Sequence, residues 1–195
     1  MNLILIAGLP ASGKSGFASY AGKELGIPVI VKDELKEILF DAIGFQSRAE
    51  KVKLGDAAMD LMYYMADRLM AGGSSVILDN NFESRSIPGL KRLLAAHACR
   101  LVTVRFDGDI RAIYQRFVER DQDPARHRGH ILNTAYPEKD PEPYVPISCE
   151  EFERKFRERG MTEFMIGGRL ITVDATSFEH YSNEELLSRL RNEME

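Results

Sequence analysis

The chain has 195 residues, of which 44% are hydrophobic and 29% charged, the proportions of an ordinary soluble globular domain. This length predicts one domain that folds without disulfide bonds or structural metals. The formal net charge of -4 argues against a surface that binds long duplex nucleic acid by neutralising its phosphates. Cys99 and Cys149 have no metal-ligand spacing and are typical of a reducing compartment, so we expect a cytoplasmic protein.

The first apolar run, Leu3–Ala7, is too short for a signal-peptide core or a membrane span, and no basic residue precedes it. We therefore expect a buried strand there and no membrane association. A monomer and a homodimer both remain compatible with the sequence.

Short β-branched runs alternate with longer segments of helical period along the chain. This alternation predicts a three-layer α/β fold, in which a parallel five-stranded sheet has crossover helices on both faces. Several of the runs are apolar at consecutive positions, as expected for strands that are covered on both sides. The predicted strands are Leu3–Ala7, Pro28–Lys32, Ser75–Asp79, Leu101–Phe106 and Arg169–Val173.

Three serines followed three residues later by glutamate have the form of a capping box and predict helix starts at Ser47, Ser148 and Ser182. After Ser47, apolar residues recur at helical spacing and predict the buried face of a helix that Gly72-Gly73 terminates. These residues are Leu54, Ala58, Leu61, Met65 and Leu69.

The segment from Asp121 to Ile147 contains five prolines and no long hydrophobic period, which excludes a continuous helix. A connection of this length inside a compact domain is usually functional. We interpret residues 121–147 as a lid within a single domain of residues 1–195, and a disordered surface insertion is the alternative.

Residues 8–15, Gly-Leu-Pro-Ala-Ser-Gly-Lys-Ser, match the phosphate-binding pattern G-x-x-x-x-G-K-[ST] at every required position. The motif lies between a predicted strand and a helical pattern, where loop amides and a helix N-terminus converge on phosphate oxygens. Lys14 would reach the β- and γ-phosphates of ATP, and Ser15 would bind Mg²⁺. The expected cofactor contacts in this segment are Gly8, Pro10, Ala11, Ser12, Gly13, Lys14, Ser15 and Gly16.

Two acidic residues follow predicted strands, at the edge where ligands gather in a parallel sheet. Asp33 is the candidate general base for an acceptor hydroxyl, although an aspartate there could also serve only as a helix N-cap. Asp79 is a candidate Mg²⁺ ligand, with Asn80 beside it as an acceptor contact or a plain turn residue.

Arg116 and Arg120 are one helical turn apart and can converge on the charge of a transferring phosphoryl group, unless they only form a solvated helix face. Arg126 would join Arg120 in binding the nucleotide. We reject a metal site at His127 and His130, because arginines alternate with them. The expected catalytic residues are Lys14, Asp33, Arg116 and Arg120, and the expected substrate-binding residues are Asp33, Lys36, Asp79, Asn80, Arg85, Arg128 and His130.

From Met1 to about Arg120 the chain resembles the small AAA-like P-loop kinases related to the kinase domain of phage polynucleotide 5′-kinase, and more loosely the zeta toxins and chloramphenicol phosphotransferases. The resemblance lies in the phosphate loop, the Asp33 segment, Leu78-Asp-Asn-Asn81 with Arg85, and Arg116-x3-Arg120. It implies ATP as donor, a strand order of 2-3-1-4-5, Asp33 as base and Arg120 as the lid residue that braces the phosphates. Lys36 replaces the arginine that the phage enzyme has three residues after its base.

The sequence thus predicts a Mg²⁺- and ATP-dependent kinase that phosphorylates a hydroxyl of a small molecule or of a short nucleic-acid end. No N-K-x-D motif of guanine-binding proteins is present, which argues against a GTPase. The alternative is a nucleotide-binding regulatory module that hydrolyses ATP slowly and has no acceptor.

Overall fold

The computed structural model describes residues 1–140 and 143–195. No helix in these two ranges is long and apolar enough to cross a membrane. Cys99 and Cys149 are free thiols.

The secondary-structure elements, in chain order, are β1 (Asn2–Gly8), α1 (Lys14–Leu25), β2 (Val29–Val31), α2 (Lys32–Ile43), α3 (Arg48–Ala71), β3 (Val76–Asp79), η1 (Ser84–Ser86), α4 (Ile87–Ala96), β4 (Arg100–Asp107), α5 (Ile110–Gln122), α6 (Arg128–Ile131), α7 (Cys149–Glu158), β5 (Arg169–Asp174), η2 (Phe178–His180) and α8 (Asn183–Met194).

The sheet has five parallel strands in the order β2-β3-β1-β4-β5, which confirms the predicted fold class and strand order. All five predicted strands form. The central strand β1 pairs with β3 on one side and with β4 on the other, so that Ile6 lies opposite Asp79 and Gly8 opposite Phe106. The phosphate loop therefore leaves the middle of the sheet.

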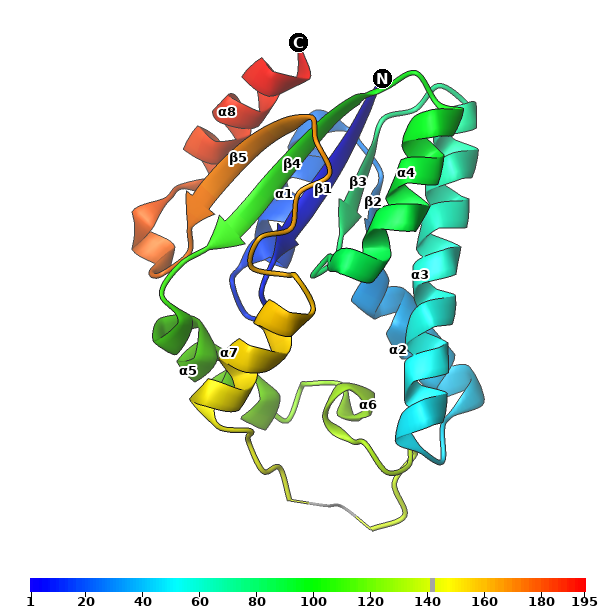
Figure 1. The fold of residues 1–195 in the computed structure, drawn as a ribbon, viewed down its shortest axis with the longest axis vertical. Helices are drawn as coiled ribbons and strands as arrows, with labels where there is room; N and C mark the ends of the chain where they lie inside the picture. Colours follow the sequence, from blue (N-terminus) through cyan, green and yellow to red (C-terminus); the bar gives the residue numbers. More distant parts are fainter. Residues whose placement is uncertain (141–142) are drawn as a thin grey trace.

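The two faces of β1 explain its unbroken apolar sequence. Leu3, Leu5 and Ala7 pack under α3 and α4, whereas Ile4 and Ile6 pack against α1 and α8 on the opposite face. Figure 1 shows these two pairs of helices on either side of the sheet. Because both faces are covered, neither could be polar without burying an unsatisfied group.

The predicted helix starts are confirmed. The hydroxyls of Ser47, Ser148 and Ser182 each accept a hydrogen bond from the backbone N–H three residues later, and α3 ends at Ala71 with Gly72 as its C-cap. Each hydroxyl satisfies a backbone donor that has no partner within its helix.

The predicted buried face of α3 is wrong in part. Leu61 and Met65 are 41% and 40% exposed, whereas their neighbours Met62 and Ala66 are fully buried. Adjacent positions are both apolar here, so helical spacing alone does not choose between two stripes that differ by one residue. The stripe that contains Ala58 and Ala66 faces the sheet, because small side chains let the helix approach it closely.

Beyond the carboxyl ends of the strands lie α2, α5, α6 and α7 (Figure 1). The predicted lid contains the end of α5 and the one-turn helix α6 but no continuous helix, as expected, and Pro141 and Glu142 fall outside the described residues. Leu132 packs with Phe40 and Phe45, and a bridge pairs Phe45 with Tyr136. Residues 132–136 are thus packed on α2 and the start of α3, and their role as a lid stays a prediction.

Gly89 in α4 permits close contact with α3. A Cβ at Gly89 would lie 2.1 Å from the Tyr63 ring, and the Tyr63 hydroxyl donates to the Ser86 carbonyl at 3.0 Å. We predict that Gly89→Ala lowers the free energy of unfolding by about 1–3 kcal/mol through overpacking, more than the helix propensity it gains. Urea denaturation measures this. In a protein that already carries Tyr63→Leu, Gly89→Ala should leave the free energy of unfolding unchanged or raise it. If Gly89→Ala lowered the free energy of unfolding there by the same amount, overpacking against Tyr63 would be ruled out.

Candidate active site

The loop between β1 and α1 adopts backbone conformations that demand glycine at two positions. Gly8 and Gly13 have φ angles of +140° and +87°. A Cβ on Gly8 would lie 2.5 Å from the Phe106 carbonyl oxygen, and one on Gly13 would lie 2.7 Å from the Tyr181 hydroxyl. Ala11, with φ of +63°, is a non-glycine residue in the left-handed region. Backbone strain of this kind is concentrated at functional sites.

The N-terminus of α1 has the features of an anion site. Its N-cap is Gly13, and no described side chain caps the first amides. The Ser12 hydroxyl is buried and has no hydrogen-bond partner within residues 1–140 and 143–195. Free amides and an unpaired hydroxyl at a helix N-terminus fit phosphate oxygens, so the loop suits the phosphates of a nucleotide.

Charged side chains meet in a cleft beside this loop. Lys14 is only 8% exposed, and the cleft also contains Ser15, Asp33 and Asp79. Burial lowers the pKa of Lys14, whereas Asp79 and Asp33 act to raise it. The structure therefore brings together the predicted lysine, base and metal ligand from α1, α2 and β3.

Asp79 fits a divalent cation. It is 2% exposed, and neither of its carboxylate oxygens has a hydrogen-bond partner among the described residues. Burial raises its pKa, which the charge of Lys14 partly offsets. The described residues hold no group of three His, Cys, Asp or Glu side chains able to bind a metal by themselves. A Mg²⁺ ion here would use Asp79 and Ser15 together with phosphate and water oxygens.

Asp33 lies in the first turn of α2 and is partly exposed, so its carboxylate faces the cleft. It is not the N-cap, because the helix starts at Lys32 with Val31 as its cap and no described side chain caps it. Burial acts to raise the pKa of Asp33, but positive charges hold it below its usual range: first that of His130 at the low pH where this ring is protonated, and then those of Lys36, Lys32 and Lys14. Asp33 is thus ionised at neutral pH.

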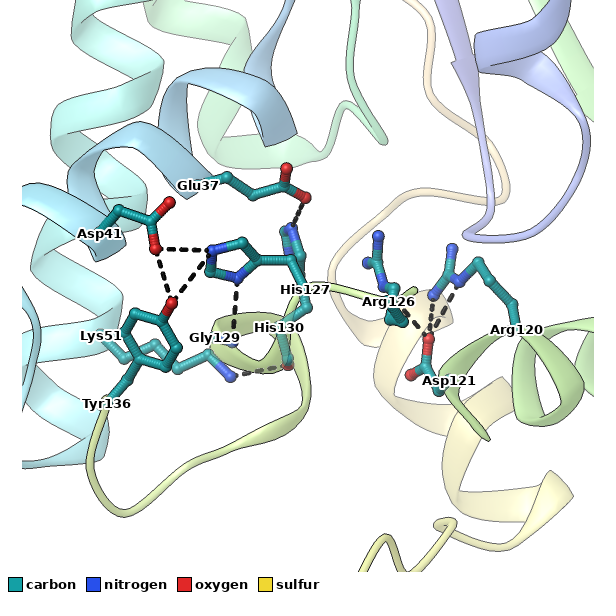
Figure 2. Close-up of polar contacts among 10 residues, drawn as sticks. All are labelled: Glu37, Asp41, Lys51, Arg120, Asp121, Arg126, His127, Gly129, His130 and Tyr136. Atoms are coloured by element: carbon teal, nitrogen blue, oxygen red, sulfur yellow. Dashed lines mark hydrogen bonds and ion pairs between the residues drawn. The ribbon is translucent and has the colours of Figure 1, made fainter. Parts of the chain in front are cut away.

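His130 stays neutral beside Asp33. Its ring is buried, and its Nε2 lies 2.7 Å from Glu37 Oε1 (Figure 2). Burial lowers the pKa of His130 to about 3, although the charge of Asp33 opposes this shift. The neutral ring donates to Glu37 and adds no positive charge at neutral pH.

Two of the predicted arginines share one carboxylate. Arg120 donates to Asp121 Oδ1 from Nε and Nη2 at 3.0 and 2.7 Å, and Arg126 Nε lies 3.6 Å from the same oxygen (Figure 2). Asp121 is buried, and both arginines are near enough to Lys14 to lower its pKa. The structure therefore brings Arg120 and Arg126 together on Asp121.

Arg116 lies elsewhere. Its guanidinium donates to the carbonyl oxygens of Ala11, Ala175 and Thr176, and it lies 4.6 Å from the Phe178 ring centre. The side chain ties the strained loop to the segment after β5, and it is not brought together with Arg120 on one anion in this structure. Its predicted catalytic role stays a prediction.

The remaining predicted substrate residues are held by different partners, and their role in binding substrate stays a prediction. Lys36 lies above the Phe40 ring, 5.2 Å from its centre, and Asn80 lines the cleft. Arg85 forms ion pairs with Asp56 and Glu83, whereas Arg128 is held by both carboxylate oxygens of Glu138.

Sequence analysis did not single out Lys32, Lys51, Arg48 or Arg159. Lys51 is buried and donates to the carbonyls of His130 and Leu132, and to Asn133 Oδ1 at 3.4 Å. No local pattern identifies this lysine, because its partners are about 80 residues away in the chain. Lys32 adjoins the candidate base, which is a signal that could have drawn attention to it.

The fold and the phosphate loop define a nucleotide-binding α/β protein of the P-loop class. The family model described as AAA domain (AAA_33) matches residues 3–133, and the chain belongs to this family. The predicted AAA-like family is thereby confirmed, whereas the closer likeness to phage polynucleotide kinase stays a prediction. A search of curated proteins found no match.

Solved structures share the fold over the whole chain. A "putative kinase" from Chloroflexus aurantiacus has 24% identity and a TM-score of 0.82, covering 100% of this chain and 98% of the other. A gluconokinase from Sinorhizobium meliloti has 15% identity and a TM-score of 0.56, covering 99% and 91%. A shikimate kinase from Bacteroides thetaiotaomicron has 13% identity and a TM-score of 0.54, covering 98% and 97%. At these identities the likeness shows the fold alone.

We predict that Lys51→Met loosens residues 128–136, because it leaves the buried carbonyls of His130 and Leu132 without their donor. Amide hydrogen exchange should accelerate at least tenfold in this segment and stay unchanged in β1. Lys53→Met, which changes an exposed lysine of the same helix, is the matched control. Equal protection in Lys51→Met and the unchanged protein would contradict the anchoring role.

Proposed function

We propose that this protein is an ATP-dependent kinase that transfers the γ-phosphoryl group of Mg-ATP to a hydroxyl of a small acceptor molecule. The main support is the ionised carboxylate of Asp33, which shares a cleft with Lys14 and Asp79 beside an anion-binding loop. A site for nucleotide binding alone would not need a second, ionised carboxylate in the cleft besides that of Asp79.

In the proposed step, the acceptor oxygen forms a bond to the γ-phosphorus while the bond from that phosphorus to the β–γ bridging oxygen breaks. The electron pair of the broken bond stays on ADP, and the hydroxyl proton passes to Asp33. Asp33 suits this task because it is ionised before the acceptor arrives and is accessible from the cleft.

Fixed cations would stabilise the charge that develops on the transferring group. Lys14 projects from the phosphate loop, and Arg120 and Arg126 converge on Asp121 nearby. Positive groups that are already positioned need little rearrangement during the reaction, which is the main source of such stabilisation. Mg²⁺, held by Ser15 and Asp79, would neutralise phosphate charge.

The solved relatives support a small-molecule acceptor, because two of them are named as kinases of gluconate and shikimate. A short nucleic-acid end, which the sequence also allowed, lacks comparable support. Slow ATP hydrolysis without any acceptor is the competing function that the next experiment separates.

Asp33→Asn should lower kcat for phosphoryl transfer by about 10²–10⁴-fold, because the amide cannot accept the acceptor proton. ATP affinity should change less than threefold. Transfer of labelled γ-phosphate to a panel of alcohols, sugars, hydroxy acids and oligonucleotides, with nucleotide binding measured by calorimetry, tests both. Unchanged kcat in Asp33→Asn would show that Asp33 is not the general base. Release of inorganic phosphate without transfer to any acceptor would favour the regulatory module that hydrolyses ATP slowly.

Lys14→Ala is the companion variant for the donor site. It removes the ammonium group expected on the β- and γ-phosphates and should weaken ATP binding at least tenfold. Lys23→Ala, at an exposed position of the same helix, is the matched control. Intact ATP affinity in Lys14→Ala would contradict the nucleotide site itself.

A pH dependence follows from Lys36. Burial lowers its pKa to about 8, while Asp33 opposes this shift and Lys32, Arg48 and Arg126 add to it. Lys36 is therefore charged below about pH 8 and neutral above it, so kcat/KM for an anionic acceptor should decline as pH rises through that value. Lys36→Arg should move this decline to higher pH, because guanidinium stays charged. If kcat/KM declined at the same alkaline pH in Lys36→Arg and in the unchanged protein, Lys36 would be excluded as the titrating group.

A further inference from the structure

A basic pocket lies where the first turns of α3, η1 and the end of α7 meet. Its volume is about 380 Å³, within the range of sites for small molecules. Four of its seven lining residues are cationic, in a chain whose net charge is negative. The lining residues are Arg48, Val52, Glu83, Arg85, Lys155, Phe156 and Arg159.

Buried Glu83 positions two of these arginines. Its carboxylate accepts from Nε of both Arg85 and Arg159, and its backbone N–H donates to the Ser86 hydroxyl at 3.1 Å. The Glu83 carboxylate is thus shared between two guanidinium groups, and Nη1 of Arg85 also pairs with Asp56 at 2.7 Å. Each arginine keeps its Nη2 without a partner in the described part of the chain, and Nη donors of this kind bind carboxylate or phosphate oxygens.

Three further cations near the pocket have no carboxylate within 4 Å among the described residues. These are Arg48, Lys32 and Lys36. The Nη1 of Arg48 donates only to the neutral Asn133 Oδ1, at 2.8 Å. Lys32 is 9% exposed, and its ammonium group makes no hydrogen bond to any described group. Buried or clustered cations without counterions are costly, so an anion that binds among them gains affinity.

Lys32 connects this pocket to the reaction centre. It directly precedes Asp33, and its pKa, which burial lowers, is also affected by the charges of Asp33 and of Arg85, Glu83 and Arg159, so its ammonium group lies near both the candidate base and the pocket. A molecule that binds an anion at the arginines can therefore extend past Lys32 and present a hydroxyl to Asp33. Val52 and Phe156 supply an apolar wall for its carbon skeleton.

We propose that the phosphoryl acceptor is a small hydroxylated molecule with a carboxylate or phosphate group, which binds to Arg48, Arg85 and Arg159 while the reacting hydroxyl lies at Asp33. This assignment rests on the proposed kinase function and names the class of its substrate. It distinguishes the acceptor from neutral sugars and alcohols, which would supply no negative charge to Arg48 or to the Nη2 groups of Arg85 and Arg159.

Matched sets of neutral and anionic compounds test the assignment. Glycerol, D-glycerate and glycerol 3-phosphate form one set, and glucose, gluconate and glucose 6-phosphate form another. In at least one set, kcat/KM for labelled phosphoryl transfer should be at least tenfold higher for an anionic member than for the neutral one. Comparison of kcat/KM between the carboxylate and the phosphate member of each set shows which of the two groups the pocket prefers.

Arg48→Met should raise KM for the preferred anionic compound at least tenfold and reduce the preference over its neutral counterpart. Arg48→Lys should restore part of this preference. Arg68→Met, which changes an exposed arginine of the same helix, is the matched control and should behave as the unchanged protein. Arg159→Met provides a second removal of pocket charge should Arg48→Met fail to fold.

Binding alone separates failure of this assignment from failure of the kinase function. With MgADP saturating the phosphate loop, calorimetry with D-glycerate and with glycerol 3-phosphate should show tighter binding to the unchanged protein than to Arg48→Met. Equal binding to both proteins, equal transfer to neutral compounds, or a preference for oligonucleotide ends would overturn the assignment. Anion binding that depends on Arg48 without any transfer would support the pocket and contradict the kinase function.

Discussion

The buried ammonium group of Lys14 is the constraint around which the site is built. It lies in a cleft with two carboxylates, those of Asp33 and Asp79, yet forms an ion pair within 4 Å with neither of them among the described residues. Charges that are buried but kept apart are unfavourable on their own. Triphosphate oxygens and a divalent cation would complete such an arrangement, because they supply the contacts that Lys14, Asp79 and the Ser12 hydroxyl lack.

The basic side chains around this centre are held by different partners, which suggests different tasks. Arg116 is committed to backbone carbonyls and supports the loop, whereas Arg120 and Arg126 share Asp121 near the phosphate side. Lys32 and Lys36 lie in α2 near Asp33 and form no ion pair with the described residues.

Local patterns were sufficient for the strands, the capped helix starts and the phosphate loop, because each depends on residues close together in the sequence. The strand order followed from the resemblance to small P-loop kinases, and the sheet confirms it. The buried stripe of α3 was partly wrong, since Leu61-Met62 and Met65-Ala66 offer two apolar faces and only the sheet decides between them. The contacts of Lys51 and Arg116 were invisible to pattern analysis, because their partners are about 60–105 residues distant. Asp33 and Asp79 could be placed together only because parallel strands end at one edge.

The supports of the phosphate loop extend beyond the region that the family model covers. That model ends at residue 133, but Gly13 is flanked by Phe178 and Tyr181, and Arg116 binds the carbonyls of Ala175 and Thr176. The loop is thus braced by the last quarter of the polypeptide. A fragment cut at the family boundary would lose an edge strand and this brace together. Sequence changes in the C-terminal region can therefore alter the conformation of the phosphate loop, even when residues 8–15 themselves stay the same.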